Sequence, residues 1–330
     1  MKRFNQSMRH LFMLLLSALV VSCGGEAQKQ TVLKLGHGLS STHPVHLGMV
    51  RMNEELVKLS NGTMSIDIYP SSQLGSEIQC IELLQIGSLD LTKVSAASLE
   101  SFVDPFKLFG IPYMFRSRAH FDNVLASEMG EYFLTCTEPF WFRGITYFDS
   151  GARSFYTTSK PINKPEDLHG LKIRVQKSPV AVEMVNTLGG SATPVDWGEL
   201  YTALQSNVVD GAENNTPSIT TAFHHEVSKY FTVTEHTFSP DVLIISSKTW
   251  AKLTEQQQKW LREAAECGRT YETKLWKEQE QVSLEMMKER GVEIIYPDKE
   301  LFIRAGEPMK RRYAEDPTFK SLIEKIEAIK

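Results

Sequence analysis

The feature that most limits how this chain can fold is a long helix near its C-terminal end. Thr254 and Gln257 have the spacing of a capping box, and no proline follows before Pro297. Only Gly268 interrupts the helical pattern. At about 1.5 Å per residue, a helix over residues 254–290 would be about 50 Å long, which is longer than one small domain. We therefore predict a single helix that spans two domains and braces a hinge; the alternative is two helices that break at Gly268.

The rest of the chain alternates strand-like and helix-like segments, which is typical of sheets covered by helices. The strand patterns lie at Val32–Gly36, Met64–Tyr69, Leu89–Val94, Gly144–Phe148, Ser154–Thr157, Leu171–Val175, Val208–Ala212 and Asp241–Ser246. The helix patterns lie at Pro44–Ser60, Ser76–Ile86, Ser178–Leu188 and Trp197–Gln205. The strand at Asp241 is mostly apolar, as a strand buried in a parallel sheet would be.

The N-terminal segment, residues 1–22, is predicted to be a secretion signal and not part of the fold. A basic start precedes an apolar run at residues 11–21, which is too short to remain as a membrane-spanning helix. The run leads into Val-Ser-Cys23, which resembles a bacterial lipobox whose cysteine is lipidated. Residues 23–30 then form a polar tether. We expect a lipid-anchored protein outside the cytoplasm; ordinary secretion with an incidental Cys23 is the alternative.

Charge and cysteine content argue against several functions. The net charge of the whole chain is −4, and residues 1–22 carry three basic and no acidic residues, so the remainder has a charge of −7. An acidic chain without a basic block disfavours nucleic acid as a partner. The cysteines beyond the lipobox, Cys80, Cys136 and Cys267, match no metal-binding spacing. We predict no metal site and buried free thiols, although one disulfide could form in an oxidising compartment.

No motif for catalysis stands out. The sequence has no phosphate-binding loop, no dinucleotide fingerprint, no zinc-protease helix and no nucleophile elbow. We therefore predict that the protein is not an enzyme and holds no cofactor. His224 and His225 are adjacent, and adjacent residues face different directions on a helix, so they make a poor metal pair. We interpret them as a solvated helix end.

Arg174 is the most informative single residue. It lies between Ile173 and Val175 in a strand-like segment, where a guanidinium buried without an anion would cost several kcal/mol. Arginine is permanently charged and matches a carboxylate in bidentate geometry. The anion could be a side chain, which would make a structural salt bridge, or an acid that arrives from outside.

Several motifs around this arginine occur in a recognisable order. They are Tyr69-Pro-Ser-Ser-Gln-Leu-Gly-Ser-Glu77, Gly151-Ala-Arg-Ser-Phe-Tyr156, Lys160 to Val175, Trp197 to Gln205 and Val209-Asp-Gly-Ala-Glu-Asn214. Together they resemble the extracytoplasmic solute-binding proteins of TRAP transporters, from about Val32 to beyond Ile294. The resemblance implies an α/β protein with the two-lobed periplasmic binding protein fold, a hinge, and a long helix that braces both lobes.

The resemblance also implies how the chain is divided and with what it works. We expect residues 31–150 plus 240–279 to form lobe I and residues 151–239 plus 280–330 to form lobe II. The expected location is the periplasm. The expected partners are a small organic acid and the membrane subunits of a transporter, with an ion gradient driving uptake.

The family motifs imply roles for individual residues. Arg174 would grip the solute carboxylate, Arg153 would assist it, Asn214 would hydrogen-bond the same group, and Trp197 would line the cleft. Further positions expected to face the cleft are Glu77, His37, Ser95, Lys177, Asn215 and Asp241. Other roles remain open: Trp197 as a core aromatic, Arg153 in a salt bridge within its lobe, and Glu77 as support for the first turn of its helix.

The polar residues opposite the arginine indicate the kind of acid. Carboxylate side chains there would repel a second solute carboxylate but accept hydrogen bonds from hydroxyl groups, and a tryptophan face suits a sugar ring. Segments 151–156, 211–215 and 235–241 look most like those of hexuronate binders, whereas Ser95 and Ser98 depart from sialic-acid binders. We expect glucuronate or galacturonate. The alternatives are another organic acid (a C4-dicarboxylate, an aldonate or a keto sugar acid), an extracytoplasmic uronate-processing enzyme such as a lyase, and an adhesin or scaffold.

Overall fold

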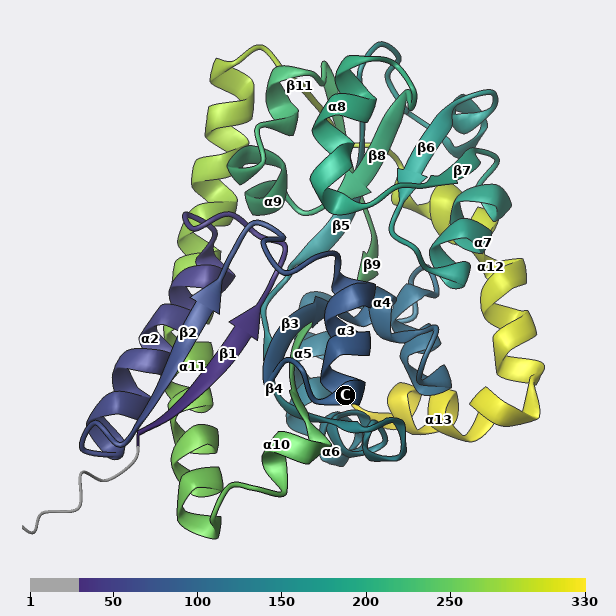
Figure 1. Cartoon of the computed structure of the whole chain (residues 1–330). Helices are drawn as coiled ribbons and strands as arrows, with labels where there is room; N and C mark the ends of the chain where they lie inside the picture. The colour runs from purple at the N-terminus through teal and green to yellow at the C-terminus, as the bar shows by residue number, and fades with distance from the viewer. Residues whose placement is uncertain (1–29) are drawn as a thin grey trace, which may run out of the picture.

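The computed structural model describes residues 30–330, and its framework is two β-sheets flanked by helices (Figure 1). The predicted secretion signal, the predicted lipidation at Cys23 and nearly all of the predicted tether lie outside the described residues.

The first sheet has the strand order β2-β1-β3-β10-β4. Its strands are β1 (Thr31–Gly36), β2 (Met64–Tyr69), β3 (Leu91–Ser95), β4 (Phe142–Phe148) and β10 (Asp241–Ser246). The ends of β10 are those predicted, but its direction is not, because β10 runs antiparallel to both β3 and β4. Its apolar character comes from burial on both faces: Val242 and Ile244 pack into one core cluster, and Leu243 and Ile245 pack into another. Burial on both faces makes a strand apolar whatever its direction.

The second sheet has the strand order β11-β9-β5-β8-β6-β7. Its strands are β5 (Ala152–Thr157), β6 (Lys172–Val175), β7 (Ser191–Pro194), β8 (Gly211–Asn214), β9 (Tyr230–Phe238) and β11 (Glu293–Ile295). β8 lies three residues later than its predicted start, and β7, β9 and β11 were not predicted at all. β9 was missed because polar and charged residues recur along it.

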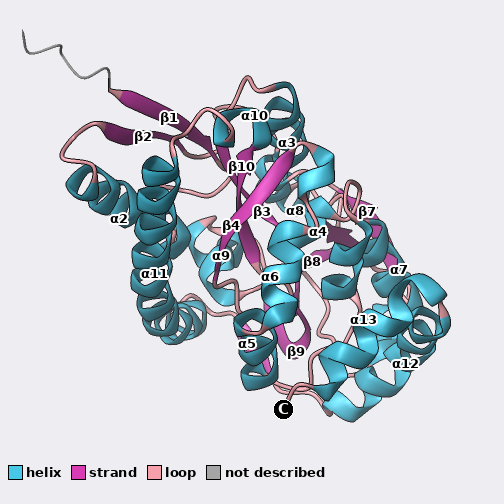
Figure 2. Ribbon diagram, turned by 90° about the horizontal axis from the view of Figure 1, so that it is seen from below, coloured by secondary structure: helices cyan, strands magenta, loops and turns pink. Residues whose placement is uncertain are grey.

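The predicted long helix is confirmed as one helix, α11 (Glu255–Glu289), with the capping box at Thr254 formed on both sides. Gly268 does not break it. Instead α11 packs at Gly268 against α2 (Pro44–Leu59), and the two helices lie side by side in Figure 2. Farther along, α11 packs against α9 (Thr216–Thr221) beside the second sheet. It therefore contacts the parts of the chain that carry both sheets.

The remaining helices flank the sheets and are α3 (Glu77–Ile86), α4 (Ala96–Leu99), α5 (Arg118–Ala126), α6 (Glu128–Thr135), α7 (Pro179–Thr187), α8 (Leu200–Gln205), α10 (Ser247–Trp250), α12 (Lys299–Glu315) and α13 (Pro317–Ala328). Two of them begin and end as their capping residues predict. Ser76 caps α3, and Gly87 ends it in the left-handed conformation (φ 78°). Ser178 caps α7, which starts at Pro179.

The two C-terminal helices pack against different parts of the chain. α12 packs against α7 and β9, whereas the ring of His120 on α5 hydrogen-bonds the carbonyl of Ile326 on α13 (2.9 Å). The division of residues between two lobes stays a prediction, and this contact shows that the last helix touches the side of the first sheet.

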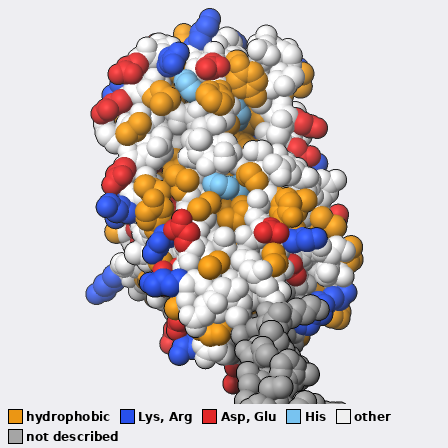
Figure 3. All heavy atoms as spheres, turned by 60° about the vertical axis from the view of Figure 1, so that its left-hand side comes forward, with side chains coloured by type: hydrophobic (Ala, Val, Ile, Leu, Met, Phe, Trp, Pro, Cys, Tyr) orange, Lys and Arg blue, Asp and Glu red, His pale blue; other side chains and the backbone are white. Residues whose placement is uncertain are grey.

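Three further findings concern residues 30–330 only. No helix in this part of the chain combines the length and apolar character needed to cross a bilayer. The cysteines are free thiols; Cys80 is buried, and Cys136 and Cys267 are half-buried. On the face seen in Figure 3, acidic and basic side chains are intermixed and form no large patch of one sign.

Candidate functional site

A cavity of about 300 Å³ lies between the two sheets and is lined by residues from both. Strand ends position these residues. Ser95 is the last residue of β3 and Asn214 the last of β8, and Asp241 is the first residue of the antiparallel strand β10. The carboxyl ends of parallel strands are a common place for ligands, because the loops that follow leave a crevice there.

Nine of the ten predicted site residues line this cavity, namely Arg174, Arg153, Asn214, Glu77, Trp197, Asp241, Asn215, Ser95 and Lys177. His37 does not. Its ring is buried, with Nε2 hydrogen-bonded to His46 (3.0 Å) and Nδ1 accepting from the backbone of Leu39 (3.1 Å). Burial, with the nearby Lys93 cation, lowers the pKa of His37 to about 2. The imidazole therefore shapes the loop after β1 and does not face the cavity.

Arg174 is buried beside the cavity without a carboxylate partner among the described residues. Its Nε donates to the carbonyl of Val195 (2.9 Å), its Nη1 has no hydrogen-bond acceptor, and its guanidinium lies 5.9 Å from the ring centre of Trp197. Burial lowers the pKa of Arg174. The structural salt bridge left open for this residue is therefore not what the structure shows.

Arg153, unlike Arg174, has a carboxylate partner within the protein. Its Nη2 donates to Glu213 Oε1 (2.8 Å), and its Nη1 donates to Asn214 Oδ1 (2.9 Å). Burial alone would raise the pKa of Glu213, but the Arg153 guanidinium and His236 lower it to about 2. Arg153 lines the cavity but is already neutralised by a salt bridge within its own sheet, one of the alternatives left open above.

Lys93 was missed by the sequence reasoning; it belongs to β3 and lines the cavity from the side of the first sheet. It is buried, and its Nζ lies 3.2 Å from Glu77 Oε1 and 3.0 Å from Asp241 Oδ2. Burial would lower the pKa of Lys93, but the two carboxylates raise it. The signal that could have found it is one that Arg174 shares, namely a cation inside a strand pattern.

Trp197 is half-buried and lines the cavity, with His224 behind it at a ring separation of 4.9 Å. The predicted solvated helix end at His224 and His225 is wrong, because both side chains are buried. His224 Nδ1 is hydrogen-bonded to the Tyr156 hydroxyl (2.9 Å), and burial with the Arg174 charge lowers the pKa of His224 to about 3. A neutral imidazole thus supports the tryptophan from behind.

Two hydrogen bonds join the two sides of the cavity directly. The Ser95 hydroxyl donates to Gln176 Oε1 (3.4 Å), and His43 Nε2 is paired with the Ser218 hydroxyl (3.1 Å). Asn215 caps α9 through the backbone N–H of Ser218 (2.9 Å). Away from the cavity the two parts of the chain are also joined, because Glu100 accepts from the Ser178 hydroxyl (2.6 Å) and one apolar core cluster contains residues of both sheets, such as Val94 and Ile173.

The charges around the cavity are unevenly arranged. On the side of the second sheet, Arg174 carries a positive charge without an ion-pair partner among the described residues. On the side of the first sheet, Lys93 offsets only one of two carboxylates, so one negative charge remains. Lys177 and Asp196 neutralise each other across 2.7 Å. The cavity therefore suits a molecule with an anionic group that faces Arg174 and hydrogen-bond donors that face Glu77 and Asp241.

Comparison with known proteins finds similarity to solute-binding proteins. The family model for bacterial extracellular solute-binding proteins, family 7 (DctP), matches residues 35–316. A TRAP periplasmic solute-binding protein from Xanthobacter autotrophicus Py2 with bound β-D-galacturonate is 37% identical, with a TM-score of 0.87, covering 90% of this chain and 100% of that one. One from Anaerococcus prevotii with bound D-glucuronate is 38% identical, with a TM-score of 0.86 and coverage of 90% and 98%. One from Polaromonas bound to D-erythronate is 30% identical, with a TM-score of 0.88 and coverage of 91% and 99%.

Proposed function

Because this chain belongs to family 7 of the bacterial extracellular solute-binding proteins, the DctP family, we propose that it captures a hexuronate such as D-glucuronate or D-galacturonate and delivers it to the membrane subunits of a TRAP transporter. The family consists of solute-binding proteins and not enzymes, so the solute is released unchanged.

The observation that carries the proposal is the unpaired guanidinium of Arg174. A buried cation without an internal anion is costly, and an incoming carboxylate removes that cost by forming a bidentate pair. In a closed, dry cavity such a pair is much stronger than in water. A solute that contacts both sides of the cavity stabilises the closed state by its differential affinity.

The side of the cavity formed by the first sheet favours a sugar acid over a dicarboxylate. Glu77 and Asp241 leave an uncompensated negative charge there, which repels a second carboxylate and accepts hydrogen bonds from hydroxyl groups. Trp197 gives the apolar face of a sugar ring a surface to stack on.

A shorter polyhydroxylated acid is the second candidate, because one solved relative holds D-erythronate. Such an acid carries the same carboxylate and hydroxyl groups. The hexuronate is preferred because a ring can contact Trp197 while its carboxylate reaches Arg174, and a four-carbon chain fills less of the cavity.

We also propose that the protein is anchored to the membrane through a lipid on Cys23, since a lipobox-like sequence precedes that residue. Cys23→Ala should move the protein from the membrane fraction to the soluble periplasmic fraction. Recovery of both forms in the soluble fraction would contradict the anchor and leave solute binding unaffected.

Thermal denaturation of the protein without residues 1–22 tests the proposed solute. Glucuronate or galacturonate at about 100 times its Kd should add about 2.7 kcal/mol to the free energy of unfolding and raise the Tm, whereas succinate should have little effect. A clear response to succinate with none to either uronate would overturn the choice of solute.

A further inference from the structure

We infer that Asp241 is the residue that recognises solute hydroxyl groups on the side of the cavity formed by the first sheet, and that Lys93 positions it for this role. This inference rests on the proposed function and names the residues that set its specificity, which is for polyhydroxylated monocarboxylates and against dicarboxylates.

The two carboxylates that contact Lys93 are not equivalent, and Glu77 is committed to the protein itself. Its Oε1 accepts from Lys93 (3.2 Å). Its Oε2 accepts from the Ser98 hydroxyl (2.6 Å) and from the backbone N–H of Ser95 (3.1 Å). Three internal donors converge on one side chain at the first residue of α3, so Glu77 fixes the start of that helix against β3.

Only one of the two carboxylate oxygens of Asp241 has a partner among the described residues. Its Oδ2 lies 3.0 Å from Lys93 Nζ, whereas its Oδ1 has no hydrogen-bond donor among the described residues. Asp241 is buried overall but lines the cavity, and its Oδ1 is not among the sealed polar atoms. A carboxylate oxygen that is open to the cavity and otherwise unpaired is a strong acceptor for a solute hydroxyl.

Lys93 gives this acceptor its orientation. Its stem is enclosed in β3, and its ammonium lies between Glu77 and Asp241, so the position of Asp241 Oδ2 is fixed from the strand next to it. Two further charged groups act on Asp241, namely Arg153, which is paired with Glu213, and Glu272 on α11. Lys93 offsets one of the two carboxylates that it contacts, and the remaining negative charge repels a second solute carboxylate.

Calorimetric titration of the protein without residues 1–22 tests the role of Asp241. The two solutes are D-glucuronate and tetrahydropyran-2-carboxylate, which keeps the ring and the carboxylate but has no hydroxyl group. Asp241→Asn should weaken glucuronate binding about 10- to 100-fold, the range expected for a hydrogen bond to a charged group. Binding of the hydroxyl-free acid should change less than about threefold.

Asp104→Asn is the matched control. Asp104 also pairs with a lysine, Lys107, but lies on the surface away from the cavity (62% exposed side chain), so both affinities should stay at the wild-type values. If Asp241→Asn keeps the wild-type affinity for glucuronate, the inference is wrong while the proposed function stands. If the wild-type protein binds neither uronate, the proposed function itself fails.

Lys93 is tested by selectivity, because a merely structural role would weaken all solutes alike. Lys93→Met leaves two uncompensated carboxylates, so the ratio of glucuronate to succinate affinity should rise; an unchanged ratio would contradict the positioning role.

A measurement on the wild-type protein keeps the inference testable even if the variants do not fold. The wild-type protein should bind glucuronate at least about 100-fold more tightly than tetrahydropyran-2-carboxylate, as expected when two or more hydroxyl hydrogen bonds are lost. A difference below tenfold would also overturn the inference.

Discussion

Gly48 of α2 and Gly268 of α11 bring two helices into backbone contact. A methyl group on Gly268 would lie 2.6 Å from the carbonyl oxygen of Gly48, and one on Gly48 would lie 3.1 Å from the carbonyl oxygen of Gly268. One turn farther along α11, Glu272 Oε2 accepts the backbone N–H of Asp149 (3.0 Å), where the chain passes from the first sheet to the second. The close approach of the helices thus places α11 against the crossing between the two sheets.

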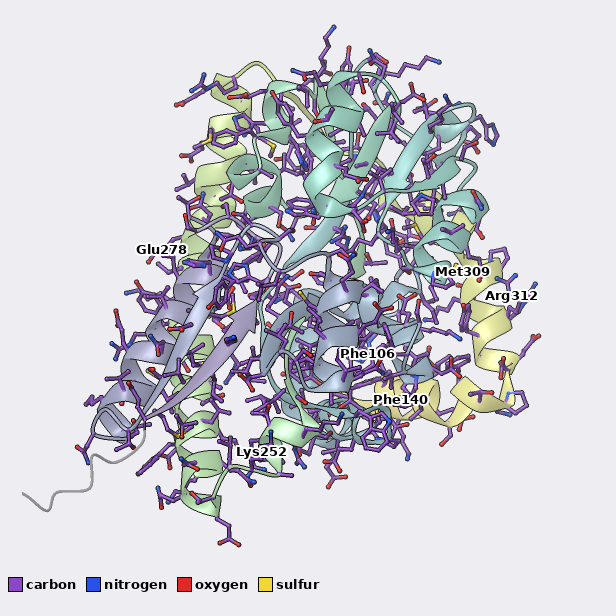
Figure 4. All side chains as sticks on the ribbon, in the orientation of Figure 1. Phe106, Phe140, Lys252, Glu278, Met309 and Arg312 are labelled. Carbon is purple, nitrogen blue, oxygen red and sulfur yellow. The ribbon has the colours of Figure 1, made fainter. Side chains whose placement is uncertain are left out.

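Gly268→Ala should destabilise the protein. Alanine improves helix propensity by about 1 kcal/mol, but its methyl group would meet Gly48 and Met52 at 2.6–2.8 Å, and overpacking of this kind costs about 1–3 kcal/mol. Urea unfolding measures the difference. Glu278→Ala, on the exposed side of the same helix (Figure 4), should change stability by less than about 0.5 kcal/mol. A more stable Gly268→Ala protein would show that the helices can move apart freely.

Arg174→Lys should lower the affinity for glucuronate by about 100-fold or more, because one ammonium cannot reproduce the planar fork of a guanidinium. Titration calorimetry measures the affinity, and melting without solute checks the fold. Arg51→Lys, on the surface of α2, serves as the control and should bind like the wild type. Unchanged affinity in Arg174→Lys would mean that the carboxylate is held elsewhere.

Glu213→Gln should cost about 3–5 kcal/mol of stability, because it leaves the buried Arg153 without its counter-ion. The pKa of Glu213 is lowered to about 2 in the folded state, so its contribution is present above the unfolded pKa and disappears as the pH falls toward 2. The variant and the wild type should therefore converge in acid. Glu266→Gln, which removes a surface pair with Arg269, should cost at most about 1 kcal/mol at every pH.

Glu100→Gln should change the pH dependence of stability on the alkaline side. Glu100 Oε2 accepts from the Ser178 hydroxyl (2.6 Å) and from the backbone of Val180 (3.3 Å), while burial raises its pKa to about 8. A raised carboxyl pKa means that the folded state holds the proton, so this stabilisation is full below the unfolded value and is lost as the pH rises through about 8.

The glutamine variant, which cannot ionise, should gain about 1 kcal/mol or more on the wild type between pH 5 and pH 9 in urea unfolding. Comparing the two proteins removes the opposite contribution of buried histidines, whose pKa values are lowered. Glu54→Gln, on the exposed surface of α2, should follow the wild type. Parallel curves for Glu100→Gln and the wild type would show that the carboxyl group is not protonated in the folded state.

Local signals predicted much of the fold. The caps of α3, α7 and α11 depend on residues within one turn of each helix end, and each was placed correctly from the sequence. Gly268 shows where this reasoning reaches its limit. A glycine in a helix pattern indicates either a break or a close contact, and only the packing of α2 decides between them.

For the candidate site too, some features could be predicted from the local sequence and others depend on the tertiary structure. A cation inside a strand pattern drew attention to Arg174, and Lys93 occupies the same kind of position, although that signal was not used. Neither pattern reveals the partner. Arg174 has none among the described residues, whereas Lys93 has Glu77 and Asp241.

By itself, the sequence determined where the capped helices α3, α7 and α11 begin, that one helix is long enough to reach both sheets, and that Arg174 lies inside a strand. Only the tertiary structure decided that β10 is antiparallel, that His224 is buried, and which cations are neutralised. The physical reason is range: capping and periodicity act over a few residues, whereas the pairing of Arg153 with Glu213 joins groups 60 residues apart and exists only once the sheet has formed.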